Sequence, residues 1–129
     1  MLSVTPVAPA ARVLLCTLPT DMRRSFDTLA GMVRQHLGGD PLSGTLFVFR
    51  SRGGDRVKVL YWDRDGYALW YKRLEKGTFR FPDPASPAPG GAGAGAASVE
   101  VSAADLLMLL EGVDLGSVKR SERFVLQKS

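Results

Sequence analysis

The sequence predicts a single α+β domain: an antiparallel β-meander sheet with one long helix packed on a face and a short C-terminal helix. Three observations predict it. Residues 21–37 carry apolar side chains at helical spacing, residues 44–75 contain three strand-like segments separated by turn signals, and a capped apolar segment lies at about 103–111. With 129 residues the chain can bury one modest core.

The first predicted element is a short buried strand at residues 12–16, because RVLLC is almost wholly apolar. Cys16 is the only cysteine of the chain, so no intrachain disulfide can form. We expect it to be a small buried hydrophobic side chain. Nothing in the sequence requires an oxidising compartment, and the cytoplasm is the expected location.

A long amphipathic helix is predicted at residues 21–37. Thr20 or Asp21 can cap its N-terminus, because a short side-chain oxygen accepts an otherwise unpaired backbone N–H. Gly38 can adopt the left-handed conformation that ends a helix. The apolar stripe of this helix consists of Met22, Phe26, Leu29, Val33 and Leu37.

Strands are predicted at residues 44–50, 56–62 and 67–75, which are rich in aromatic and β-branched side chains. The intervening segments SRGGD and DRDG are typical of turns. A short fourth strand is expected at residues 78–81. Strands joined by such short turns form an antiparallel meander.

The register of the second hairpin decides which side chains share a face. A three-residue turn of Arg64, Asp65 and Gly66 is favoured, because it separates an apolar face from a mixed one. We expect the long helix to cover the apolar face, made of Val57, Val59, Tyr61, Tyr67, Leu69 and Tyr71. The mixed face would carry Lys58, Leu60, Trp62, Ala68, Trp70 and Lys72.

Two interpretations of the mixed face remain open. Trp62 and Trp70 can form a cross-strand pair that the second helix covers. Alternatively, they can form a partly open platform on which nucleic-acid bases stack while lysines meet phosphates.

The C-terminal part of the domain is predicted to add a strand at residues 99–101 and a helix at about 103–111. Ser102 can cap this helix, and Asp105 follows three residues later as in a capping box.

The predicted organisation is a flexible arm at 1–11, a domain at 12–118 and a basic tail at 119–129. Within the domain, residues 82–98 are rich in proline, glycine and alanine and are expected to form a flexible excursion.

Positive charge is concentrated in two places. Residues 50–80 contain nine cations and four carboxylates, an excess of five, and the tail 119–129 adds an excess of three. The rest of the chain sums to −4, because the whole chain has a formal net charge of +4. This distribution predicts an anionic partner. The candidate nucleic-acid-binding residues are Arg50, Arg52, Arg56, Lys58, Trp62, Trp70, Lys72, Arg73 and Lys76.

The sequence contains no recognisable catalytic motif. His36 is the only histidine, so a zinc site of histidine and cysteine ligands lacks donors. Asp55, Asp63 and Asp65 could share a magnesium ion as in nucleases, although their turn positions explain them more simply. No apolar run approaches the length of a membrane span. We therefore predict no enzymatic activity, no catalytic residue, no metal, no cofactor and no membrane partner.

Three segments together resemble a known family. They are TDMRRSFDTLAGMV, SGTLFVFRSRGGDRVKVLYWDRDGYALWYKRLEKGTFRFP and LLMLLEGVD, and the resemblance covers about residues 12–115. The chain resembles the TnpB-type accessory protein, the second open reading frame product, of bacterial insertion sequences of the IS sixty-six type. Two features depart from the usual pattern: residues 82–98 look longer than is typical, and GVDL at 112–115 replaces GIDW.

The resemblance implies a helper role in transposition beside a larger transposase, and it implies no defined catalytic residue. We therefore predict a non-catalytic accessory factor that binds DNA, the transposase of the same element, or both, through a basic sheet region containing tryptophan. A pure protein-interaction module that never touches DNA is the alternative.

Overall fold

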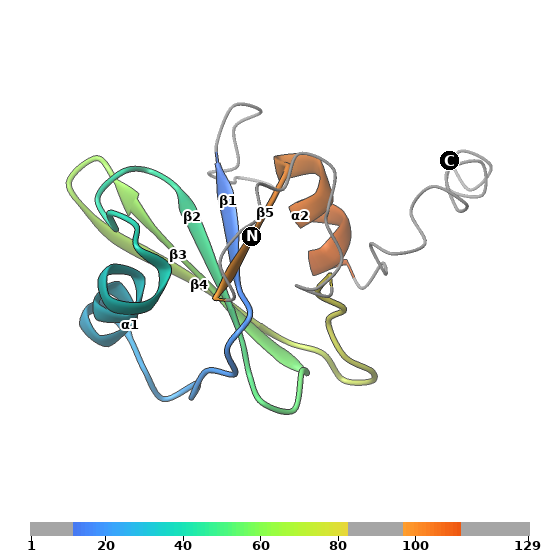
Figure 1. Ribbon diagram of the computed structural model, residues 1–129. Coiled ribbons are helices and arrows are strands. Elements are labelled where there is room, and N and C mark those ends of the chain that lie inside the picture. The colour runs from blue at the N-terminus through green and yellow to red at the C-terminus, as the bar shows by residue number, and fades with distance from the viewer. Residues whose placement is uncertain (1–11, 83–96, 112–129) are drawn as a thin grey trace.

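The computed structural model describes residues 12–82 and 97–111, which form a five-stranded sheet with helices on both faces (Figure 1). The strand order is β4-β3-β2-β1-β5. The strands are β1 (Val13–Cys16), β2 (Leu46–Arg50), β3 (Arg56–Asp63), β4 (Gly66–Arg73) and β5 (Ser98–Val101). The helices are α1 (Phe26–Met32), which continues as a π-helical turn η2 (Val33–Leu37), and α2 (Ala103–Leu110).

The predicted α+β fold class is confirmed. The sheet is mostly antiparallel: β2, β3 and β4 form a meander, and β5 pairs antiparallel with β1. The pair β1–β2 is parallel, with Val13 beside Leu46. The chain reverses direction between them through α1, which is the crossover that a parallel pair requires.

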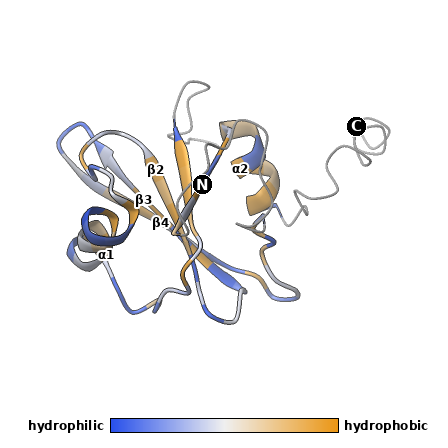
Figure 2. Cartoon of the chain, in the orientation of Figure 1, coloured by the Kyte–Doolittle hydropathy of each residue, from blue (hydrophilic) through white to orange (hydrophobic). Residues whose placement is uncertain are grey.

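Two apolar cores lie on opposite faces of the sheet, because successive strand residues point to opposite sides. On one face, α2 buries Leu106 and Leu109 against strand residues that include Val57. On the other face, α1 buries Leu29 against residues that include Leu60. Figure 2 shows the resulting pattern, with hydrophobic strands between two helices that are partly hydrophilic.

Two local predictions about the ends of the domain are confirmed. Ser102 caps α2, since its Oγ accepts a hydrogen bond from Asp105 N at 3.0 Å. Cys16 is 1% exposed, and burial raises the pKa of its thiol. A buried thiol that stays protonated acts as a small hydrophobic side chain.

The predicted start of the first helix is wrong. The helix begins after Ser25, not at residue 21, and the Thr28 hydroxyl accepts a hydrogen bond from Ser25 N. Residues 21–24 form a turn instead, in which Arg24 N bonds to Asp21 O. The predicted end is confirmed, because Gly38 caps η2 with a left-handed φ of 65°.

The predicted fourth strand at residues 78–81 is absent from the described part of the chain, which is irregular there. Phe79 is nevertheless fully buried, and its N–H bonds to Gly54 O at 2.7 Å. The arm 1–11, most of the excursion 82–98 and the tail 119–129 lie outside the described residues.

The predicted register of the β3–β4 hairpin is also wrong. Asp63 pairs with Gly66, so the turn has two residues, and Arg64 adopts a left-handed φ of 55°. The shift by one residue places Val57 and Val59 on the face of α2 together with Trp70, whereas Leu60 faces α1. A one-residue shift exchanges the faces of a whole strand. Burial of both faces thus outweighs the cost of about 1–2 kcal/mol for a non-glycine residue in the left-handed region.

An ion pair joins the chain beside β1 to β5, and its stability contribution should depend on pH. Arg12 Nε and Nη2 donate to the two carboxylate oxygens of Glu100 at 3.1 and 3.0 Å. These hydrogen bonds lower the pKa of Glu100. A lowered folded-state pKa stabilises the protein above the unfolded pKa of about 4.3, and this stabilisation is lost as the pH falls through the folded value.

We expect Glu100→Gln to lower the free energy of unfolding by less than about 1 kcal/mol at neutral pH, because both side chains are partly exposed. The difference between variant and wild type should shrink as the pH falls below about 4. Urea unfolding at neutral and acidic pH measures it. A difference that is equal at both pH values would contradict this linkage.

Candidate nucleic-acid interface

Three segments meet at the end of the sheet where β2 ends and β3 begins, and we call this region the basic end. They are residues 18–24 before α1, residues 51–56 between β2 and β3, and residues 73–80 after β4. In Figure 1 the loop from β1 to α1 and the β2–β3 turn lie together at the bottom of the sheet.

Backbone hydrogen bonds hold these segments side by side. Leu74 N bonds to Asp55 O at 2.8 Å, and Phe79 N bonds to Gly54 O at 2.7 Å. Thr20 N bonds to Arg50 O at 2.9 Å. The basic end is thus a built surface rather than three independent loops.

The basic end has a strong excess of positive charge. It carries seven cationic side chains and only three carboxylates, those of Asp21, Asp55 and Glu75, so its formal excess is four. Cross-strand partners Arg56 and Arg73 lie directly opposite one another, an arrangement of like charges that destabilises a sheet unless an anion compensates it. The seven cations are Arg23, Arg24, Arg52, Arg56, Arg73, Lys76 and Arg80.

Four of these cations have no carboxylate within ion-pair distance in the described part of the chain: Arg24, Arg52, Lys76 and Arg80. All four are exposed. The other three have acidic neighbours, but only Arg23 makes a short contact, at 2.8 Å from Asp21. Arg56 and Arg73 lie at 3.6 and 3.9 Å from theirs. Most of the positive charge is therefore available to a partner.

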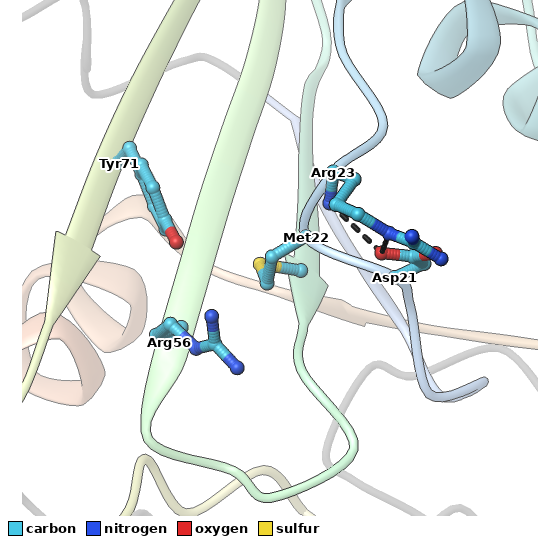
Figure 3. Close-up of a pocket in the computed structure, with 5 residues that line it drawn as sticks. All are labelled: Asp21, Met22, Arg23, Arg56 and Tyr71. Atoms are coloured by element: carbon cyan, nitrogen blue, oxygen red, sulfur yellow. Dashed lines mark hydrogen bonds and ion pairs between the residues drawn. The ribbon is translucent and has the colours of Figure 1, made fainter.

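A shallow pocket opens on the basic end between the loop before α1 and the two outer strands (Figure 3). Arg56 and Tyr71 come from β3 and β4, and Asp21, Met22 and Arg23 come from the loop. Tyr71 is 50% exposed. The pocket combines two guanidinium groups with an accessible aromatic ring, which suits a phosphate beside a sugar or base.

Lys58, a predicted contact residue, is instead a buried structural residue that is 7% exposed. Its Nζ donates to the carbonyl oxygens of Met22 and Arg24, both at 2.7 Å. The ammonium also lies 4.9 Å from the centre of the Tyr71 ring. Lys58 therefore fixes the loop before α1 to the sheet, which brings Arg23 and Arg24 to the basic end.

Two further predicted contact residues, Lys72 and Arg50, use their charged groups for contacts within the protein. Lys72 Nζ donates to Leu110 O at 3.1 Å, which satisfies a carbonyl at the C-terminus of α2. Arg50 Nη1 donates to Phe79 O at 2.9 Å, and its guanidinium lies 4.4 Å from the centre of the Phe81 ring. Burial lowers the pKa of Arg50.

Trp62 and Trp70 do not share a face, so neither the predicted cross-strand pair nor the predicted platform of two indoles forms. Trp70 lies opposite Val59 and packs against the core under α2. Trp62 packs edge-on against Tyr67, with ring centres 5.2 Å apart. Trp62 also lies next to the β3–β4 turn, at the far end of β3 from the basic end.

The comparisons with known proteins bear on the role of this surface. Residues 11–120 match the family described as "IS66 Orf2 like protein". The chain belongs to this family. Among curated proteins it is 41% identical over 109 residues to "Uncharacterized protein y4hO" of Sinorhizobium fredii (strain NBRC 101917 / NGR234), covering 84% of this chain and 86% of that protein.

A second relative in the same organism, "Uncharacterized protein y4jC", is 37% identical over 109 residues, covering 84% of this chain and 85% of that protein. No solved structure matches the chain significantly. Membership of the IS66 Orf2-like family indicates an accessory role in transposition, and this family is not a known enzyme family.

In this IS66 Orf2-like protein the sequence did not identify three cations of the basic end as contact residues. Arg23 and Arg24 fell within the helix predicted at residues 21–37, and Arg80 within the strand predicted at residues 78–81. Only the contacts of Lys58 and Phe79 bring them beside the β2–β3 turn. The density of arginine within residues 50–80 was the one sequence signal that pointed to this region.

The three aspartates considered for magnesium cannot share one ion. Asp55 precedes β3, whereas Asp63 ends it and Asp65 follows it. Eight strand residues separate the two sites by about 25 Å. The described residues contain no group of three or more histidine, cysteine or acidic side chains placed to hold a metal. Among the same residues, neither helix has the length and apolar character needed to traverse a bilayer.

Proposed function

We propose that this IS66 Orf2-like protein is a non-catalytic accessory factor in transposition, and that it contacts DNA through its basic end. The observation that carries the proposal is the concentration of seven cations and three carboxylates at one end of the sheet. Membership of the family supports the transposition context.

The chemistry of the basic end favours the phosphate backbone over base edges. Its free cations lie on loops and strand ends, where long flexible side chains can follow a strand of phosphates. Tyr71, half exposed beside Arg56, can add a stacking or sugar contact. Recognition by such groups depends on charge and should vary little with DNA sequence.

The nine predicted contact residues thus differ in their roles. Arg52, Arg56, Arg73 and Lys76 belong to the proposed contact surface. Lys58 and Arg50 hold segments that carry it, and changing them would alter binding indirectly. Lys72 instead holds the C-terminus of α2. The tryptophans have no part in this revised surface.

We expect the salt dependence of DNA binding to report these contacts. Each phosphate contact contributes about −0.9 to the slope of log affinity against log salt concentration. In the double variant Arg52→Gln and Lys76→Gln the slope should become shallower by about two, with weaker binding at low salt. Fluorescence anisotropy of a labelled duplex at several salt concentrations measures both quantities.

The matched control is the double variant Arg34→Gln and Arg64→Gln, which removes the same charge from exposed positions outside the basic end. It should keep nearly the wild-type slope. If the two double variants lose equal amounts of DNA affinity and of salt slope, only the total charge of the protein matters. An unchanged slope in the first variant would reject the basic end as the DNA surface.

The same experiment separates the alternative, a module that binds only the transposase. That alternative predicts no measurable DNA affinity at low salt. It also predicts that purified transposase captures the chain equally well with and without nuclease treatment. Interfaces between proteins are also enriched in arginine and tyrosine, so only binding measurements distinguish the two.

A further inference from the structure

The outer edge of β4 is open in the described part of the chain. β4 has eight residues and is the last strand of the sheet on its side. None of its residues is buried, whereas four of the five residues of β2 are. The opposite edge strand, β5, has only four residues. Within the described residues, the outer edge of β4 therefore presents a long row of unpaired backbone N–H and C=O groups.

The sequence of β4 lacks the features that usually protect an edge. From Tyr67 to Tyr71 it has no charged residue, no proline and no glycine, and two of its five side chains are tyrosines and one is Trp70. Its charged residues, Lys72 and Arg73, lie at its C-terminal end. An edge of this length and composition favours pairing with another strand.

Self-pairing of β4 restricts the register to a few choices. Directly opposite residues of an antiparallel pair project to the same face, so paired residues must differ by an even number. The two-fold axis then passes midway between the two copies of one self-paired residue. Two centres give the longest pairing within β4. A centre at Leu69 pairs residues 66–72 of the two copies, and a centre at Trp70 pairs residues 67–73.

The charges distinguish these two registers. Centring on Leu69 brings Asp65 of one copy beside Arg73 of the other, twice by symmetry. Centring on Trp70 brings Asp65 beside Glu75, which is repulsive. Arg73 is free to change partner, because its own ion pair with Glu75 is long, at 3.9 Å, and exposed.

Side-chain packing agrees with the Leu69 register. It sets Tyr67 opposite Tyr71 on the face of α1, twice, with Leu69 opposite itself between them. On the other face it sets Trp70 opposite the small Ala68. Aromatic cross-strand pairs and large-with-small packing both stabilise a sheet.

We propose that β4 pairs antiparallel with β4 of a second copy of this chain, centred on Leu69, and joins two five-stranded sheets into one. The interface is isologous, as in most symmetric dimers. The two basic ends then lie at opposite ends of the joined strands. Each keeps six of its seven cations for an anion, because Arg73 pairs with Asp65 of the other copy, so the dimer offers two anion-binding surfaces.

The test begins with the full chain in the absence of DNA, so its result is independent of the proposed function. Sedimentation equilibrium across the micromolar range should show a monomer–dimer equilibrium. A chain that stays monomeric throughout this range overturns the proposal.

Charge reversal tests the register. Asp65→Arg alone and Arg73→Asp alone should each weaken the dimer by about tenfold, since each creates two repulsive pairs. The double variant should return to within about threefold of the wild-type affinity, because attraction is restored with the signs exchanged. Single variants that dimerise like the wild type, or a double variant as weak as the singles, overturn the register.

Cross-linking gives a second readout. In the Leu69 register Tyr67 of one copy lies opposite Tyr71 of the other, at the distance of about 4.5–5.5 Å between Cα atoms that a disulfide can span. A mixture of the variants Tyr67→Cys and Tyr71→Cys should form a covalent dimer on mild oxidation, whereas neither variant alone should. Circular dichroism establishes that both variants are folded. Absence of the covalent dimer in a mixture of folded variants counts against the proposal.

Discussion

Replacing Phe79 with alanine is expected to lower the free energy of unfolding by about 3–5 kcal/mol, the usual cost of removing a buried phenylalanine. Phe79 is fully buried in the core beneath α2, although it lies in an irregular segment. Its ring anchors the chain that carries Lys76 and Arg80. The loss is a large fraction of the stability of a domain of this size. Urea unfolding followed by circular dichroism measures it.

Phe81→Ala is the matched control for this prediction. Phe81 is only partly buried and contacts the guanidinium of Arg50. Its removal should cost clearly less, because less apolar surface is lost and a partly exposed cation–π contact contributes about 0.5–1 kcal/mol. Equal costs for the two variants would show that Phe79 is not the anchor of this segment.

The second large effect is expected at Lys58. Lys58→Met keeps most of the side-chain volume but removes two charge-assisted hydrogen bonds to the carbonyl oxygens of Met22 and Arg24. Both carbonyls then lose their donor. We expect the free energy of unfolding to fall by about 2–3 kcal/mol. Chemical denaturation of variant and wild type under the same conditions measures the difference.

Lys76→Met removes the same charge from an exposed position and should change stability by less than about 0.5 kcal/mol. The pair of variants therefore separates structural from binding lysines: Lys58→Met should act mainly on folding and Lys76→Met mainly on DNA binding. A Lys58→Met variant as stable as the wild type would mean that the two carbonyls find other donors at no cost.

These two residues explain why the basic end exists as one surface. Lys58 fixes the loop before α1, and Phe79 fixes the segment after β4. Neither contributes charge to solvent. The cations that face outward depend on them for their position, so a loss of DNA affinity in either variant would follow from loss of structure.

Local sequence signals predicted several elements correctly because each depends on neighbouring residues alone. Ser102 with Asp105 predicted the start of α2, and Gly38 predicted the end of the first helix. Segments rich in aromatic and β-branched residues, separated by turn signals, predicted β2, β3 and β4. The start of the first helix was missed, although Ser25 and Thr28 form a local cap there. Asp21 is a good cap, but Lys58 holds residues 22–24 in a non-helical conformation by donating to the carbonyl oxygens of Met22 and Arg24. These partners lie 36 and 34 residues from Lys58 in the sequence.

The sequence predicted the positive charge of the candidate site correctly, but it did not predict which side chains lie together there. Arginines and lysines between residues 50 and 80 indicated an anionic partner, and five of them belong to the proposed surface: Arg52, Arg56, Arg73, Lys76 and Arg80. The role of the tryptophans was misjudged because the hairpin turn was predicted to contain three residues, Arg64, Asp65 and Gly66, whereas it contains two. In the structure Arg64 is the turn residue with a left-handed φ. Glycine is the usual residue in that conformation, so the sequence did not indicate Arg64.

By itself, the sequence determined the fold class, most strands, the family and the charge excess. It also determined the caps Ser102 and Gly38. The tertiary structure decided which side chains share a face and which cations share a surface. The physical reason is that a strand alternates with a period of two, so one residue of register reverses its faces. That register is settled by the burial of Val57, Val59 and Leu60 in two cores at once, which no short segment encodes.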